Sequence, residues 1–188
     1  MDSTTATLIS AIVVMVIFSA YFSATETAFS SLNKIRLRSK AEAGDTRAAL
    51  TLSIANEYDR MLSTILIGNN IVNITASTLG TVLFTRLFDA YGPTISTVVL
   101  TVVVLIFGEI SPKSIAKESP ERFAMWASPL LRVLLVILRP LNVLLSQWKR
   151  LLSHIIRPAD GEGITEDGSS PWSPRRKTKA AWTSTKAS

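Results

Sequence analysis

Long apolar runs alternate with polar, charged stretches between Leu8 and Leu152. The runs at residues 7–29, 61–88 and 93–110 have about the length that a helix needs to cross the ~30 Å hydrocarbon core of a bilayer. The pattern therefore predicts an all-α integral membrane protein with three transmembrane helices. Polar but helix-favouring sequence beside these runs predicts additional juxtamembrane amphipathic helices.

The first run is predicted to be a retained helix and not a cleaved signal peptide. The residues before it, 1–5, contain an acid and no base, whereas a signal peptide begins with a basic segment. The run is also longer than the apolar part of a typical signal peptide.

Two belt segments are expected beside the spans, at residues 31–58 and 123–152. Gly44 and Asp45 should divide the first segment into two amphipathic helices. The second segment contains Arg132 and Arg139, and an arginine at mid-bilayer costs about 2.5–3.5 kcal/mol. We therefore expect it to lie in the membrane interface, broken near Pro129 and Pro140, with a fourth crossing as the alternative.

The formal net charge of +6 does not predict a nucleic-acid partner, because the basic residues flank apolar runs. This is the positive-inside pattern of membrane proteins. It predicts a multi-pass protein of the inner (plasma) membrane with its N-terminus outside and its C-terminus and belt segments on the cytoplasmic side. The bases that carry this prediction are Lys34, Arg36, Arg38, Lys40, Lys113, Lys117 and Arg122.

Composition excludes most catalytic chemistry. The chain has no cysteine and a single histidine, His154, which lies outside the apolar runs. Thiolate metal sites, cysteine nucleophiles and multi-histidine centres are therefore excluded. We expect no catalytic residues and no enzymatic activity.

Polar residues nevertheless recur inside the spans. In the first span Ser19, Ser23 and Glu26 share one helical face, and in the second Asn70, Asn73 and Ser77 do so beside Asn69. The third span is interrupted by the sequence from Gly108 to Lys113. Such residues either hold helices together or line an ion path.

The interruption in the third span points to a cation. Pro112 has no N–H and clashes with the carbonyl of Gly108, which frees that oxygen beside the Glu109 carboxylate. Carboxylate, carboxamide, hydroxyl and carbonyl oxygens together suit a hard cation such as Mg²⁺, Ca²⁺ or Na⁺. The alternatives are that Glu109 pairs with Lys113 four residues later, and that Glu26 pairs with a base at the interface.

Three motifs on successive spans resemble the CNNM/CorC family of magnesium transporters, also called hemolysin-like proteins. They are FSATETA at residues 22–28, GNNIVN at 68–73 and GEISPK at 108–113. The resemblance implies a homodimer that carries Mg²⁺ across the membrane by alternating access, as efflux or exchange coupled to Na⁺. It implies Ser19, Ser23, Asn70, Gly108 and Glu109 as cation ligands. Glu26, Asn69, Asn73, Pro112 and Lys113 would line the path or shape the helix break.

The 188 residues are expected to form one domain, residues 1–157, and a tail, residues 158–188. Family members usually continue into ATP-binding CBS modules, which the tail does not resemble. We expect the tail to be disordered or the product of a frameshift near Gly168, and the chain to be truncated. Alternative functions are a non-transporting Mg²⁺ sensor or modulator, an inactive family member, and polar clusters that serve only dimer assembly.

Overall fold

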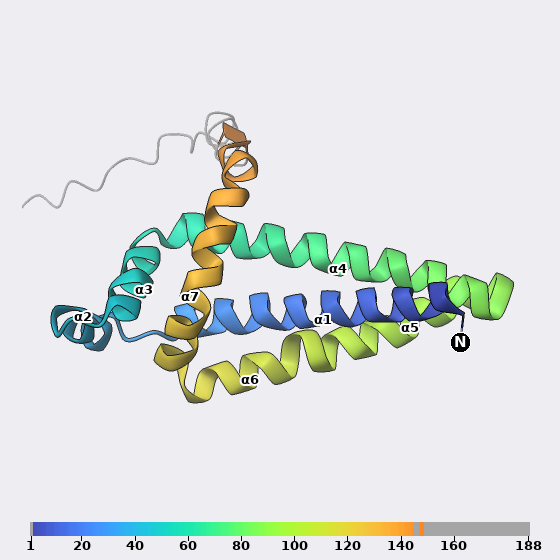
Figure 1. Ribbon diagram of the computed structural model, residues 1–188, viewed down its shortest axis with the longest axis horizontal. Coiled ribbons are helices and arrows are strands. Elements are labelled where there is room, and N and C mark those ends of the chain that lie inside the picture. The colour runs from blue at the N-terminus through green and yellow to red at the C-terminus, as the bar shows by residue number, and fades with distance from the viewer. Residues whose placement is uncertain (1, 145–146, 149–188) are drawn as a thin grey trace, which may run out of the picture.

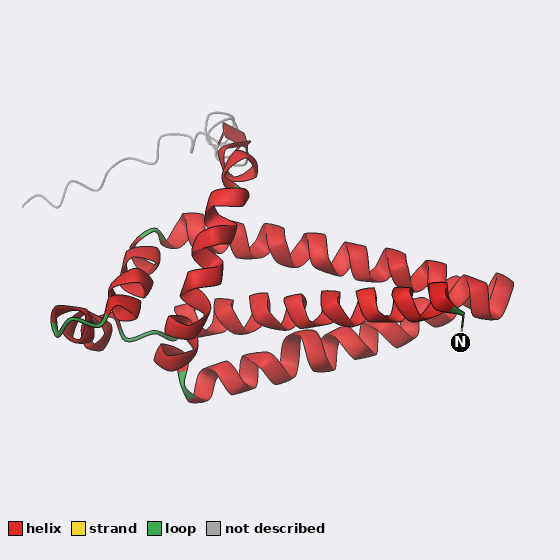
Figure 2. Cartoon of the chain, in the orientation of Figure 1, coloured by secondary structure: helices red, strands yellow, loops and turns green. Residues whose placement is uncertain are grey.

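The computed structural model describes residues 2–144 and 147–148. Within these residues the chain consists of helices joined by short loops and contains no strand (Figure 2). The expected all-α class is confirmed for this part of the chain. The tail at 158–188 and the end of the second belt segment lie outside the described residues.

Three helical passes lie side by side in the molecule (Figure 1). Helix α1 is Ser3–Ser30, helix α4 is Tyr58–Phe88, and the third pass is built from consecutive pieces. These pieces are α5 (Gly92–Val103), a π-helical segment η2 (Val104–Ile110) and α6 (Ser111–Glu118). A short 3₁₀ turn, η1 (Asp89–Tyr91), reverses the chain between α4 and α5, and Asp89 adopts a positive φ of 47° there.

Two helical stretches are long and apolar enough to cross a bilayer, Ser3–Ser30 with 28 residues and Tyr58–Glu118 with 61. The second stretch folds back on itself at η1, so it supplies two of the three passes (Figure 1). Large apolar side chains on these helices face outward, with Ile17 61%, Ile74 67% and Phe107 62% exposed. Apolar surface of this kind is stable against lipid and not against water.

Helices α2 (Lys34–Glu42) and α3 (Thr46–Asn56) form a pair at one end of the bundle (Figure 1). The side chains of Asn33 and Asp45 cap them by accepting hydrogen bonds from the first free backbone N–H groups. Gly44, with φ +96°, makes the turn between them in a conformation that favours glycine. The division lies where the sequence predicts it.

Helix α7 (Pro120–Ile137) runs across the ends of the long helices instead of alongside them (Figure 1). The expected break at Pro129 is wrong, because Pro129 lies inside α7 and the helix continues to Ile137. Hydrogen bonds to the two residues directly before the proline hold this helix in place. The Tyr21 hydroxyl donates to the Ala127 carbonyl at 2.8 Å, and the hydroxyls of Thr51 and Ser128 are hydrogen-bonded at 2.7 Å.

The core lies mainly where α1, α3, α4 and α7 meet. Its fully buried members include Ala28, Met61, Ile65 and Leu131. A smaller cluster of Ile12, Leu83 and Leu100 packs the opposite end of the bundle. Between the two clusters, Ser19 of α1 meets Asn69 of α4 and Gly108 of η2.

Candidate cation site

Ser19, Asn69 and Gly108 meet where α1, α4 and η2 come together; we call this meeting point the seam. Ser19 is fully buried, and its hydroxyl donates to the side-chain oxygen of Asn69 at 3.2 Å. A Cβ atom on Gly108 would lie only 3.0 Å from the Ser19 hydroxyl oxygen. The absence of a side chain at Gly108 therefore lets backbone and hydroxyl approach each other directly.

The backbone of η2 departs from α-helical geometry at the seam. The N–H of Ser111 bonds to the carbonyl of Ile106, five residues earlier, as in a π-helix. In an α-helix the Gly108 carbonyl would accept from residue 112, which is proline and has no N–H. The proline removes the N–H that would bond this carbonyl in a regular α-helix, and π-turns of this kind occur often at functional sites.

The other predicted residues of α1 lie further along the helix, between the seam and the α2–α3 end. Ser23 is buried one turn after Ser19. Glu26 is partly exposed, and its carboxylate lies 3.7 Å from the Lys113 ammonium of α6. Glu109 is partly buried in η2, and within the described residues it has no ion-pair partner.

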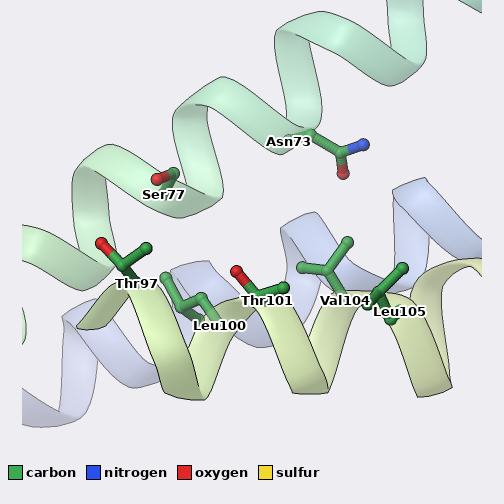
Figure 3. Close-up of a pocket in the computed structure, with 7 residues that line it drawn as sticks. All are labelled: Asn73, Ser77, Thr97, Leu100, Thr101, Val104 and Leu105. Carbon is green, nitrogen blue, oxygen red and sulfur yellow. The ribbon is translucent and has the colours of Figure 1, made fainter. Parts of the chain in front are cut away.

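The asparagines of α4 do not all reach the seam. Asn69 does so through Ser19, whereas Asn70 is exposed. Asn73 instead lines a separate cavity of about 260 Å³ between α4 and α5 (Figure 3). Its side-chain oxygen is buried there without a hydrogen-bond partner.

This cavity, which we call the α4–α5 cavity, is lined by neutral polar groups and apolar side chains. Figure 3 shows Asn73 and Ser77 on α4 opposite the threonines of α5. Sequence reasoning missed Thr97 and Thr101, although their spacing of four residues in a valine-rich run marks one helical face. It also predicted Asn70, and not Asn69, as a cation ligand. The sequence does not determine this choice, because the rotation of α4 about its axis depends on packing.

The seam is poor in charge. Within the described residues no three acidic or histidine side chains gather into a metal-binding group. The oxygen groups of the seam are the Ser19 hydroxyl, the Asn69 carboxamide oxygen and backbone carbonyl, and Glu109 follows Gly108 in the π-helical segment that borders it. These are hard oxygen donors that favour cations such as Mg²⁺ or Na⁺ over zinc or copper.

Residues 10–167 match the family described as the cyclin M transmembrane N-terminal domain, CNNM. The chain belongs to the CNNM family. This match confirms the resemblance carried by the three motifs, and it identifies the helical bundle as a membrane domain that associates with the lipid bilayer.

Relatives of this CNNM domain are mostly named as UPF0053 proteins. The chain is 44% identical to the UPF0053 inner membrane protein YfjD of Escherichia coli over 73% of its own length and 32% of that protein. It is 40% identical to a UPF0053 protein of Haemophilus influenzae over 80% of its length and 36% of that protein. A polyamine export protein of Haemophilus influenzae is 27% identical over 70% of the chain and 33% of its own length. The chain thus spans about a third of the length of these relatives.

Proposed function

We propose that this CNNM domain carries Mg²⁺ across the plasma membrane, as efflux coupled to Na⁺, with the cation bound at the seam. The observation that supports this proposal most strongly is the meeting of Ser19, Asn69 and the π-turn of Gly108 and Glu109. An unpaired carboxylate beside irregular backbone inside a membrane domain is energetically costly. Such a residue is therefore a candidate functional residue.

In the proposed mechanism each residue has a separate role. Glu109 supplies the one negative charge that draws a cation into the seam. Ser19, Ser23 and the Gly108 carbonyl supply neutral oxygens that replace part of its water shell, and Mg²⁺ keeps the remaining waters because it dehydrates reluctantly. No covalent step is proposed. Rocking of the third pass against α1 would expose the seam alternately to the two sides of the membrane.

We also propose three membrane crossings, with the N-terminus outside and the α2–α3 pair in the cytoplasm. The long helices, the reversal at η1 and the basic residues of α2 support this arrangement. A homodimer is proposed because the α4–α5 cavity presents Ser77, Thr97 and Thr101 at exposed positions. Hydroxyls at bilayer depth are better placed against another helix than against lipid.

The function is tested by Mg²⁺ flux into proteoliposomes that contain the purified chain and a trapped Mg²⁺-sensitive dye. We expect a flux that depends on an opposing Na⁺ gradient and falls at least tenfold in Glu109→Gln. The matched control is Glu118→Gln, at an exposed position of α6, which should retain the flux. A folded wild-type protein without any flux, but with Mg²⁺ binding, would support the sensor or modulator function instead.

Spermidine is the competing substrate to include, since one relative is named a polyamine export protein. The proposed site has a single carboxylate, that of Glu109, and within the described residues no three acidic side chains gather, which matches a compact dication better than a long polycation. We therefore expect Mg²⁺ flux to be insensitive to equimolar spermidine. Faster movement of spermidine than of Mg²⁺ would reverse the assignment of the substrate.

A further inference from the structure

Lys113 forms an ion pair that links the third pass to α1. It lies on α6, four residues after Glu109, and its ammonium is 3.7 Å from the Glu26 carboxylate on α1. The two side chains are only partly exposed, at 41% for Lys113 and 36% for Glu26. This ion pair therefore bridges α1 and the third pass at the α2–α3 end of the seam.

A second carboxylate, that of Glu109, precedes the same lysine by four residues along the third pass. An acid followed four residues later by lysine is the favoured order for an ion pair along one helix. Glu109 and Lys113 have this order across the junction of η2 and α6. In the structure Lys113 contacts Glu26, and Glu109 has no ion-pair partner among the described residues.

We propose that Lys113 is a tethered cation that competes with Mg²⁺ for Glu109. When Mg²⁺ occupies the seam, Lys113 is held by Glu26; when the cation leaves, the ammonium moves to Glu109 and neutralises it. This inference rests on the proposed function. Its physical reason is that a bare carboxylate in a low-dielectric site is costly, so an empty carrier needs a substitute charge before its helices can rearrange.

The proposal gives Glu26 a role that differs from simple electrostatic attraction of Mg²⁺. Under the proposal Glu26 promotes Mg²⁺ binding only by holding Lys113 away from Glu109. Glu26→Gln should therefore weaken Mg²⁺ binding while Lys113 is present and have no effect once Lys113 is removed. If Glu26 merely attracted Mg²⁺ through its charge, Glu26→Gln would weaken binding equally in both backgrounds.

The test is a double-mutant cycle on the full chain in detergent, with the Mg²⁺ dissociation constant measured by isothermal titration calorimetry. We expect Glu26→Gln to raise that constant about two- to fivefold and Lys113→Gln to lower it about two- to fivefold, in line with a partly exposed ion pair. The double variant should match Lys113→Gln. Lys117→Gln, on an exposed face of α6, is the control for loss of one positive charge and should leave the constant unchanged.

The outcomes of this cycle distinguish a failure of the tethered-cation proposal from a failure of the proposed function. Equal effects of Glu26→Gln in the two backgrounds overturn the tethered-cation role while leaving the cation site intact. Absence of Mg²⁺ binding in the folded wild type overturns both. If Lys113→Gln does not fold, Lys113→Met replaces it, because methionine preserves the apolar stem of the side chain. The double variant with Glu26→Gln must then have the same Mg²⁺ dissociation constant as Lys113→Met.

Discussion

Glycines lie where the long helices come closest together. A Cβ atom on Gly68 of α4 would lie 2.3 Å from the ring of Phe22, and one on Gly80 would lie 2.0 Å from a methyl group of Leu100. Phe22 is 3% exposed, so its ring has little room to move. Close approach through small residues is how membrane helices gain packing energy without a hydrophobic driving force between them.

Gly68→Ala should accordingly destabilise the fold by about 1–3 kcal/mol, the usual cost of overpacking a filled core. Thermal unfolding in detergent measures this change. Thr78→Ala, at an exposed position of the same helix, is the control and should change stability by no more than about 0.5 kcal/mol. An unchanged midpoint for Gly68→Ala would mean that α1 and α4 are not packed as described.

The elements are joined by a few buried hydrogen bonds at the end of the bundle where α7 crosses. Tyr21 of α1 donates to the Ala127 carbonyl, and Thr51 of α3 is bonded to Ser128. These bonds fix a helix that contains an internal proline. They lie directly before Pro129, where the proline removes one helical hydrogen bond.

Tyr21→Phe isolates one of these links, because it removes a single hydroxyl and keeps the ring. We expect a loss of about 0.5–1.5 kcal/mol in unfolding free energy, the net value of one buried hydrogen bond. Tyr91 is 77% exposed, so Tyr91→Phe should leave the unfolding free energy nearly unchanged in the same assay. Equal effects of the two substitutions would show that the Tyr21 hydroxyl does not tie α1 to α7.

The long helices and the turn at Gly44 were predictable because each follows from local sequence: apolar length in one case, a glycine next to a capping aspartate in the other. The same local reasoning failed at Pro129, where tertiary contacts override the break. At the site, sequence indicated Ser19, Gly108 and Glu109, but not that Asn69 reaches Ser19 while Asn70 is exposed. That distinction depends on how α4 is rotated by packing at Gly68 and Gly80, which single-helix periodicity does not determine.

On the scale of the whole molecule, the belt helices gather at one end of the bundle and η1 lies at the other (Figure 1). The chain lacks native cysteine, so single introduced cysteines report their side of the membrane without background labelling. We expect a membrane-impermeant maleimide to label Ala90→Cys on intact spheroplasts. Ser39→Cys on α2 and Arg139→Cys beyond α7 should react only after permeabilisation. Labelling of Arg139→Cys from outside would instead require the fourth crossing.

The central claim is that Glu109 at the π-turn holds a divalent cation, and thermal unfolding against Mg²⁺ concentration tests it most directly. A ligand that binds only the folded state adds about 2.7 kcal/mol of stability at a hundredfold excess over its dissociation constant. We predict a rise in the unfolding midpoint with Mg²⁺ for the wild type and for Glu118→Gln, and none for Glu109→Gln. An equal rise in all three proteins, or no rise in a folded wild type, would contradict a cation site at Glu109.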